Sequence, residues 1–172
     1  MEINGAAYLY ALAATAMAFL GFSVVVVILR QTLGASLSRF QTLLMQLFIE
    51  HAFVAAFLAL LPLLLALFAI SHELIWRICS AFAGIFIACW MSYFVARRYP
   101  VATSKPHTSQ AWLNYGISFL IVVALLANAA GFPYHPQVGI YAVGVSWVLL
   151  QGIDIFIISL KGFLRTERRK TD

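Results

Sequence analysis

The sequence predicts an all-α integral membrane protein with five transmembrane helices, an external N-terminus and a cytoplasmic C-terminus. Of the 172 residues, 63% are hydrophobic and 10% are charged, and the mean hydropathy is +0.94. So few polar side chains cannot cover a water-soluble globule. The apolar residues fall in runs of about 20, the length that crosses about 30 Å of hydrocarbon. The basic residues fall in every second connection between these runs, which sets the orientation.

The first apolar run covers residues 6–29, and four further runs follow it. The N-terminal sequence MEINGAAYLY lacks the basic region and cleavage site of a signal peptide, so we expect the first run to remain as a span. Glycine, serine and proline mark the short breaks between runs, which predicts antiparallel neighbours. All five form one predicted domain, residues 1–172, with a short basic cytoplasmic tail at 161–172. The predicted spans are 6–29, 40–70, 75–96, 112–130 and 138–160.

Lysine and arginine predict which side of the membrane each connection faces, because positively charged loops stay in the cytoplasm. All of them except Arg77 flank the first connection, lie in the third, or follow the last span. We therefore expect a multi-pass protein of the cell membrane, the inner membrane if the cell is bacterial, in contact with membrane lipid. These basic residues are Arg30, Arg39, Arg97, Arg98, Lys105, Lys161, Arg165, Arg168, Arg169 and Lys170.

The second run is the longest. Its 31 residues would measure about 46 Å as one helix, more than the hydrocarbon thickness. In one arrangement, residues 40–51 lie along the cytoplasmic surface as an amphipathic helix and residues 52–70 span the membrane. In the other, the whole run is a single tilted or bent helix, with the bend at Pro62.

A single helix would align polar side chains into a stripe that enters the membrane from the cytoplasmic face. Thr42, Gln46 and Glu50 form this stripe, and Phe53 and Phe57 continue it. A carboxylate at such depth costs about 2.5–3.5 kcal/mol and is functional by default. We expect Glu50 to bind protons or small cations, Gln46 and Thr42 to line the same pathway, and the two phenylalanines to act as an apolar gate.

An ion pair offers a competing explanation for each acid in the spans. Glu50 could pair with a nearby cation such as Arg39 and fix its helix at the interface. Asp154 in the fifth span, with Gln151 one turn before it, could pair with a snorkelling Lys161. If Asp154 and Gln151 instead line the same cavity as Glu50, the two spans together form an acidic inner vestibule of the ion pathway.

Small side chains in the third span predict close helix packing. Ser80, Gly84, Ala88 and Ser92 recur every four residues and form one ridge, against which another helix can pack closely. The first span has a similar face at positions 11, 14, 18 and 21. Five slim helices can scarcely enclose a water-filled path alone. We therefore expect a homo-oligomer with any conducting path on its symmetry axis.

The sequence has no HExxH, CxxC or glycine-rich phosphate-binding motif, and its histidines are scattered. We therefore expect neither enzymatic activity nor a cofactor or metal site. Topology and attraction to anionic lipid account for the basic tail, so we expect no nucleic-acid binding. The leading functional prediction is an oligomeric channel-like protein that passes protons or small cations. The alternative is a non-conducting accessory or scaffold protein that binds partner helices and anionic lipid.

Overall fold

The computed structural model of the chain describes residues 5–32, 39–68, 70–98, 108–132 and 135–171. These residues form five α-helices and their turns, with no strand among them. Each helix contains a stretch long and apolar enough to cross a membrane, as the sequence predicts. The helices are α1 (Ala6–Thr32), α2 (Arg39–Ala66), α3 (His72–Arg98), α4 (Thr108–Ala130) and α5 (Val138–Thr171).

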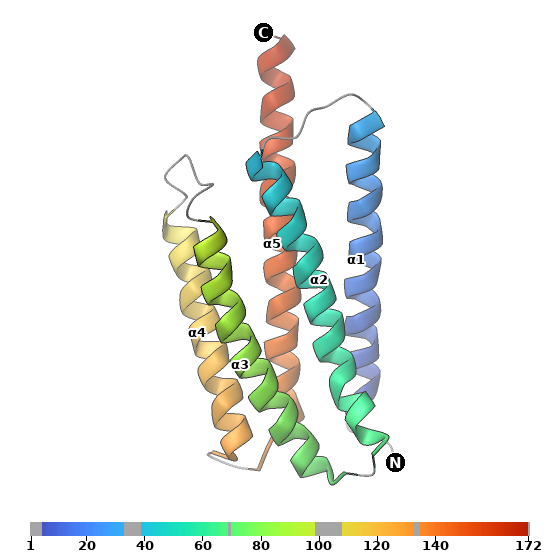
Figure 1. Ribbon diagram of the computed structural model, residues 1–172, viewed down its shortest axis with the longest axis vertical. Helices are drawn as coiled ribbons and strands as arrows, with labels where there is room; N and C mark the ends of the chain where they lie inside the picture. Colours follow the sequence, from blue (N-terminus) through green and yellow to red (C-terminus); the bar gives the residue numbers. More distant parts are fainter. Residues whose placement is uncertain (1–4, 33–38, 69, 99–107, 133–134, 172) are drawn as a thin grey trace.

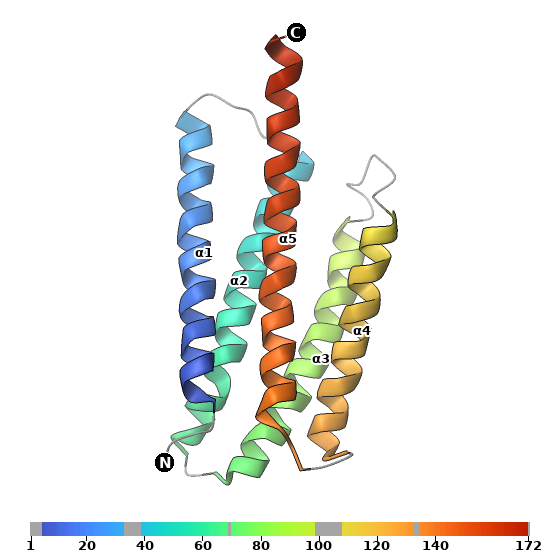
Figure 2. The ribbon, with the colours of Figure 1, turned by 180° about the vertical axis from the view of Figure 1, so that it is seen from behind.

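The helices form an up-and-down bundle in which chain neighbours run antiparallel (Figure 1). α2 and α5 make the most extensive contact and form the centre, with α1 packed on α2 and the α3–α4 pair on the other side. Figure 2 shows the bundle from behind, with α5 in front of α2. Among the described residues α1 contacts only α2 and α5, so it stands at the edge of the bundle.

Basic residues collect at one end of the bundle. α1, α3 and α5 end there, and α2 and α4 begin there (Figure 1). Arg77 lies near the opposite end, in the first turns of α3, and forms an ion pair of 2.8 Å with Glu73. The helix positions at the basic end are Arg30, Arg39, Arg97, Arg98, Lys161, Arg165, Arg168, Arg169 and Lys170.

All five helices have bounds that differ from the predicted spans, and the differences that bear on the predictions are in α2 and α5. α2 is continuous from Arg39, which favours the single-helix arrangement over a break at residue 51, and it ends at Ala66 rather than Ile70. Its end is a tight turn, where the amides of Leu67 and Phe68 bond carbonyls three residues back. α5 continues through the predicted tail to residue 171, because this segment is rich in the good helix formers lysine, arginine and leucine.

Pro62 lies inside α2 and removes the amide N–H that would bond the carbonyl of Leu58, four residues earlier. The hydroxyl of Tyr141 on α5 donates to that carbonyl at 2.5 Å. Tyr141 is fully buried, and its ring packs against Trp76 of α3 with centroids 5.7 Å apart. Hydrocarbon offers no hydrogen-bond donor. The contact therefore lets a central helix keep a proline in its interior.

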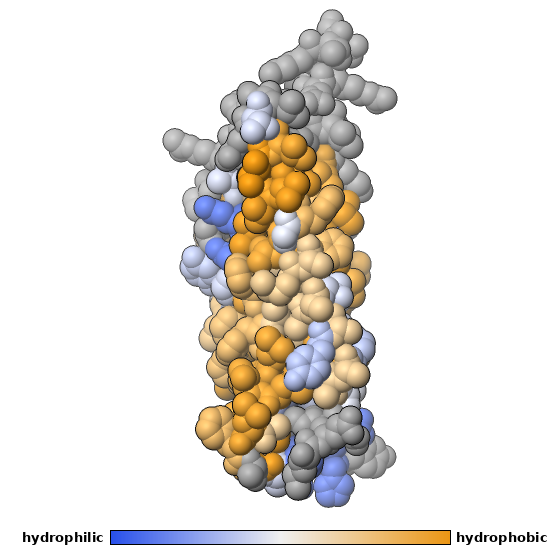
Figure 3. Space-filling model, turned by 90° about the vertical axis from the view of Figure 1, so that its right-hand side faces the viewer, coloured by the Kyte–Doolittle hydropathy of each residue, from blue (hydrophilic) through white to orange (hydrophobic). Residues whose placement is uncertain are grey.

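Glycines set the closest helix contacts. A Cβ added to Gly152 of α5 would lie 3.0 Å from the Cβ of His51 on α2. One added to Gly84 of α3 or Gly144 of α5 would lie 3.0 Å from a leucine side chain of α4. The outside is different: most of the face shown in Figure 3 is apolar. This combination of close internal packing and an apolar exterior is what lipid as a solvent requires.

Gly152→Leu is expected to destabilise the bundle by about 1–3 kcal/mol, because the new side chain must push α2 away from α5. Gly116→Leu on α4 is the control, since nothing lies within 4 Å of a Cβ added there. Thermal unfolding in detergent, followed by loss of the monodisperse gel-filtration peak, measures both variants. Equal melting temperatures would show that the α2–α5 contact has spare space.

Candidate functional site

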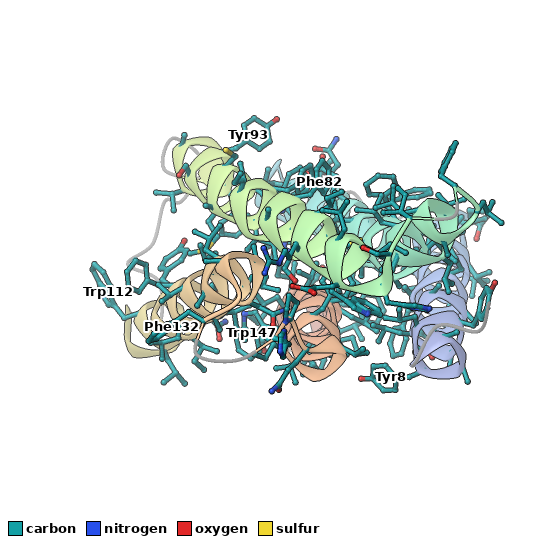
Figure 4. All side chains as sticks on the ribbon, turned by 90° about the horizontal axis from the view of Figure 1, so that it is seen from below. Tyr8, Phe82, Tyr93, Trp112, Phe132 and Trp147 are labelled. Carbon is teal, nitrogen blue, oxygen red and sulfur yellow. The ribbon has the colours of Figure 1, made fainter. Side chains whose placement is uncertain are left out.

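Polar side chains of α4 and α5 form a ladder of hydrogen bonds that runs from the middle of the bundle toward its basic end. Ser118 accepts one bond from the indole N–H of Trp147, at 2.9 Å, and one from the amide of Gln151, at 2.7 Å. One turn away, the amide of Asn114 donates to a carboxylate oxygen of Asp154 at 3.2 Å. Figure 4 shows Trp147 between the two helices. We call these five residues the α4–α5 ladder.

The hydroxyl of Ser118 uses its full hydrogen-bonding capacity. It also donates to the carbonyl of Asn114 at 2.8 Å, so its proton and both lone pairs are engaged. Hydrogen bonds between membrane helices contribute about 0.6–1.7 kcal/mol each. The ladder therefore ties α4 to α5 and gives Gln151 and Asp154 a structural role. Sequence analysis missed Asn114 and Ser118, although their spacing of four residues is the signal of a polar helix face.

The polar residues of α2 lie on the outside of the bundle. Thr42 and Gln46 are exposed, Glu50 is partly buried, and Phe53 and Phe57 are 53% and 48% exposed. Intervals of three and four residues place all five on one helix face, which we call the outer stripe. The other faces of α2 contact α1, α3 and α5. The stripe therefore faces away from the centre of the single chain.

Glu50 and His51 point in different directions. His51 is buried, its Nδ1 donates to the carbonyl of Leu47 at 2.6 Å, and the carbonyl can only accept. Its ring meets those of Trp90 and Phe94 edge-on, with centroids 5.9 and 6.3 Å away. Glu50 keeps part of its surface on the outer stripe, while its Oε2 atom is buried. His51 is thus a helix-packing residue, and the carboxylate lies at the margin of the stripe.

A row of aromatic rings on α3 borders the outer stripe. Phe57 contacts Phe82 edge-on at 6.0 Å, Phe82 stacks on Phe86 at 5.8 Å, and Phe86 stacks on Trp90 at 6.0 Å. The spacing of four residues along α3 brings these three rings over one another. Phe82 and Tyr93 of this helix lie on its outer side in Figure 4. The row holds Phe57, one of the two predicted gate residues, against α3.

The contacts between helices place Glu50 and Asp154 at about the same depth along the bundle axis. Asp154 bonds Asn114, which lies only two residues after Trp112, the start of the apolar stretch of α4. Glu50 lies at about the same level, because the residue after it packs against Gly152. At 1.5 Å per residue, Asn114 is about 3 Å, or half a helical turn, inside Trp112. Along their own helices, Asp154 is about 9 Å inside Leu160 and Glu50 about 12 Å inside Thr42, the ends of those apolar stretches. Both carboxylates lie in the half of the bundle nearer the basic end.

The two sets of predicted pathway residues face different neighbours. Gln151 and Asp154 face α4, whereas Thr42 and Gln46 are exposed on the outer stripe. In the described part of the chain the backbones of α2 and α4 do not approach each other closely. Thr42 and Gln46 therefore lie on a different side of the bundle from the α4–α5 ladder, and a shared vestibule of Glu50 and Asp154 stays a prediction. The side chains of Arg39 and Lys161, the expected ion-pair partners, lie outside the described residues.

The predicted ridge on α3 meets α4 over its first half. Ser80 is buried and accepts a hydrogen bond of 2.8 Å from the amide of Asn128. Gly84 is buried against leucine side chains of α4, Ala88 is partly buried, and Ser92 is exposed. The ridge thus serves as a helix contact within one chain at its first two positions.

The described residues contain no group of three or more histidine, cysteine, aspartate or glutamate side chains that could hold a metal ion. No protein-family model, curated protein or solved structure matches the chain.

Ser118→Ala is expected to destabilise the protein by about 1 kcal/mol, because it leaves two donors without their acceptor. Trp147→Phe should then cost less in the Ser118→Ala background than in the wild type, since both changes remove one shared bond. Ser92→Ala is the control, because that hydroxyl bonds only a carbonyl of its own helix. Unfolding of the single and double variants measures the coupling. Strictly additive losses would contradict the shared acceptor.

Proposed function

We propose that this chain is a multi-pass membrane protein with an external N-terminus and a cytoplasmic C-terminus. Several copies assemble with their outer stripes around one axis and pass protons or small cations along it. The supporting observation is the outward position of the stripe on α2. This helix is otherwise covered by its neighbours, yet its polar residues and both gate phenylalanines share its exposed face.

The charge distribution supports the orientation. All the lysines and arginines except Arg77 belong to segments at, or connected at, one end of the bundle. Positively charged segments stay on the cytoplasmic side of a membrane. The end of α5 therefore lies in the cytoplasm, and the turn between α2 and α3 lies outside.

The order of side chains along the outer stripe suits passage of a cation. From the basic end the stripe presents Thr42 and Gln46, then the carboxylate of Glu50, then Phe53 and Phe57. A ring of carboxylates around an axis attracts cations, and an apolar constriction beyond it gates by excluding water. Glu50 lies eight residues, or about 12 Å, inside Thr42, the start of the apolar stretch of α2, so cations would reach it from the basic end.

The interior of one chain is apolar over much of its length, which supports a path between several copies rather than through one. The ladder reaches Ser118, and the next polar side chain along α4 is Asn128, ten residues or about 15 Å away. Buried Val122 and Leu125 fill the interval. A path formed between subunits on a symmetry axis avoids this apolar segment.

Liposomes that contain the purified protein are expected to show a proton or small-cation flux that falls about tenfold or more with Glu50→Gln. A tenfold fall corresponds to about 1.4 kcal/mol of lost cation stabilisation. Asp154→Asn is the matched control, because this acid lies at the same level but faces α4. It should keep the flux and lower only the stability.

The same assay separates the competing explanations. Flux that survives Glu50→Gln but is lost in Asp154→Asn would move the path from the outer stripe to the ladder. If wild-type protein of confirmed orientation gives no flux, the accessory or scaffold function becomes the better proposal.

The scaffold function has its own supporting observation on α1. The small residues at positions 11, 14, 18 and 21 are all exposed, and a Cβ added to Gly21 would have no neighbour within 4 Å. Such a face lets the helix of a partner approach closely in lipid.

Cross-linking distinguishes the two faces. In a chain with Cys79→Ala and Cys89→Ala, oxidation of Gln46→Cys in membranes is expected to give covalent dimers, because the outer stripes face one another. Leu120→Cys on α4 is the control, since this residue is 66% exposed but lies on another side. Dimers from Ala18→Cys on α1 with none from Gln46→Cys would contradict assembly through the stripe.

A further inference from the structure

Pro62 removes the backbone donor that would bond the Leu58 carbonyl, and a side chain of another helix bonds it instead. Leu58 and Tyr141 are both fully buried, and the phenolic hydroxyl donates to the Leu58 oxygen at 2.5 Å. Every other interior carbonyl of a regular helix receives an amide from its own chain four residues later. At Leu58 the continuity of α2 therefore depends on a side chain of α5.

The donor is held in place from a third helix. The ring of Trp76 on α3 packs against that of Tyr141 with centroids 5.7 Å apart and the planes tilted by 55°. Trp76 is 4% exposed. α2, α3 and α5 thus meet at one hydrogen bond, in the half of the bundle away from the basic end.

We propose that Leu58 and Pro62 form a hinge in α2 and that the Tyr141 hydroxyl is its latch. A bond to a side chain of another helix is released by a small shift of α5, whereas a bond within a helix is released only by unwinding it. When the latch opens, the segment 39–57, which carries the outer stripe, can tilt against the segment 63–66. The proposed latch controls the bend of α2, and this proposal does not depend on whether the protein passes ions.

Distance measurements between two spin labels on α2 test the hinge. Gln46→Cys and Leu64→Cys place labels on exposed positions on either side of it, 18 residues or about 27 Å apart along the helix. The labelled full-length chain, with Cys79 and Cys89 replaced by alanine, is reconstituted in bilayers and diluted with unlabelled protein. Tyr141→Phe removes the hydroxyl and keeps the ring on Trp76.

The expected result is a broader distance distribution in Tyr141→Phe than in the parent chain. Pro62→Ala restores an amide donor to the Leu58 carbonyl, so Tyr141→Phe should cause no broadening in that background. An unchanged distribution in Tyr141→Phe would overturn the proposal, as would broadening that persists with Pro62→Ala. Should Tyr141→Phe fail to fold, rescue of folding by Pro62→Ala supports the latch, and failure of the rescue overturns it.

Discussion

Hydrocarbon supplies no hydrogen bonds, so the polar groups inside the bundle depend on partners in the protein. Among the described residues, most of the buried polar side chains have one, and the buried Trp90 Nε1 and Ser159 Oγ atoms are exceptions. In the described contacts, α4 and α5 supply hydrogen-bond partners for polar groups of the other helices. Tyr141 of α5 satisfies α2 at Leu58, and Tyr8 of α1 is hydrogen-bonded to Ser146 of α5 at 2.7 Å. The ladder joins α4 to α5, and Asn128 joins α4 to Ser80 of α3. Every helix is therefore tied to another by at least one polar contact, in addition to the packing of apolar side chains.

Asn128 shows how much one amide can do under this constraint. Besides bonding Ser80, it donates to the backbone carbonyl of Gln137 at 3.1 Å and accepts from the Gln137 amide at 2.7 Å. The residue is 2% exposed. A single side chain thus bonds the Ser80 hydroxyl of α3 and the backbone just before α5. Without Asn128, the N–H and the carbonyl of Gln137 would each lose this partner.

The number, length and order of the helices follow from hydropathy, because an apolar run of membrane length has few alternatives to a helix. The faces of those helices are harder to predict. In a membrane protein both the buried and the exposed sides are apolar, so the composition of α2 does not reveal that Leu58 faces α5 while Leu64 faces outward. Partners across helices, such as Ser118 and Gln151, depend on how the helices are rotated. The length of the second run left two arrangements open, and only the backbone distinguishes them.

Glu50 and Asp154 illustrate why depth alone does not assign a role to an acid. They lie at one level, yet Asp154 is bonded to a neighbouring helix and Glu50 lies at the margin of an exposed face. The difference is set by helix rotation, which one sequence does not record. A role in ion passage depends on whether the carboxylate lies on the surface that lines the path. Because the two acids lie on different surfaces at the same depth, each serves as a control for the other.

If the basic end faces the cytoplasm, as we propose, the cations gathered there also oppose reversal of the chain across the membrane. A membrane potential acts on each elementary charge with about 2.3 kcal/mol per 100 mV. Moving the nine basic helix residues of that end through an inside-negative field of this size would cost on the order of 20 kcal/mol, before any cost of desolvation. In the proposed orientation, an energised membrane would thus oppose reversal of the inserted protein, and dissipating the voltage would lower that barrier without altering a contact inside the bundle.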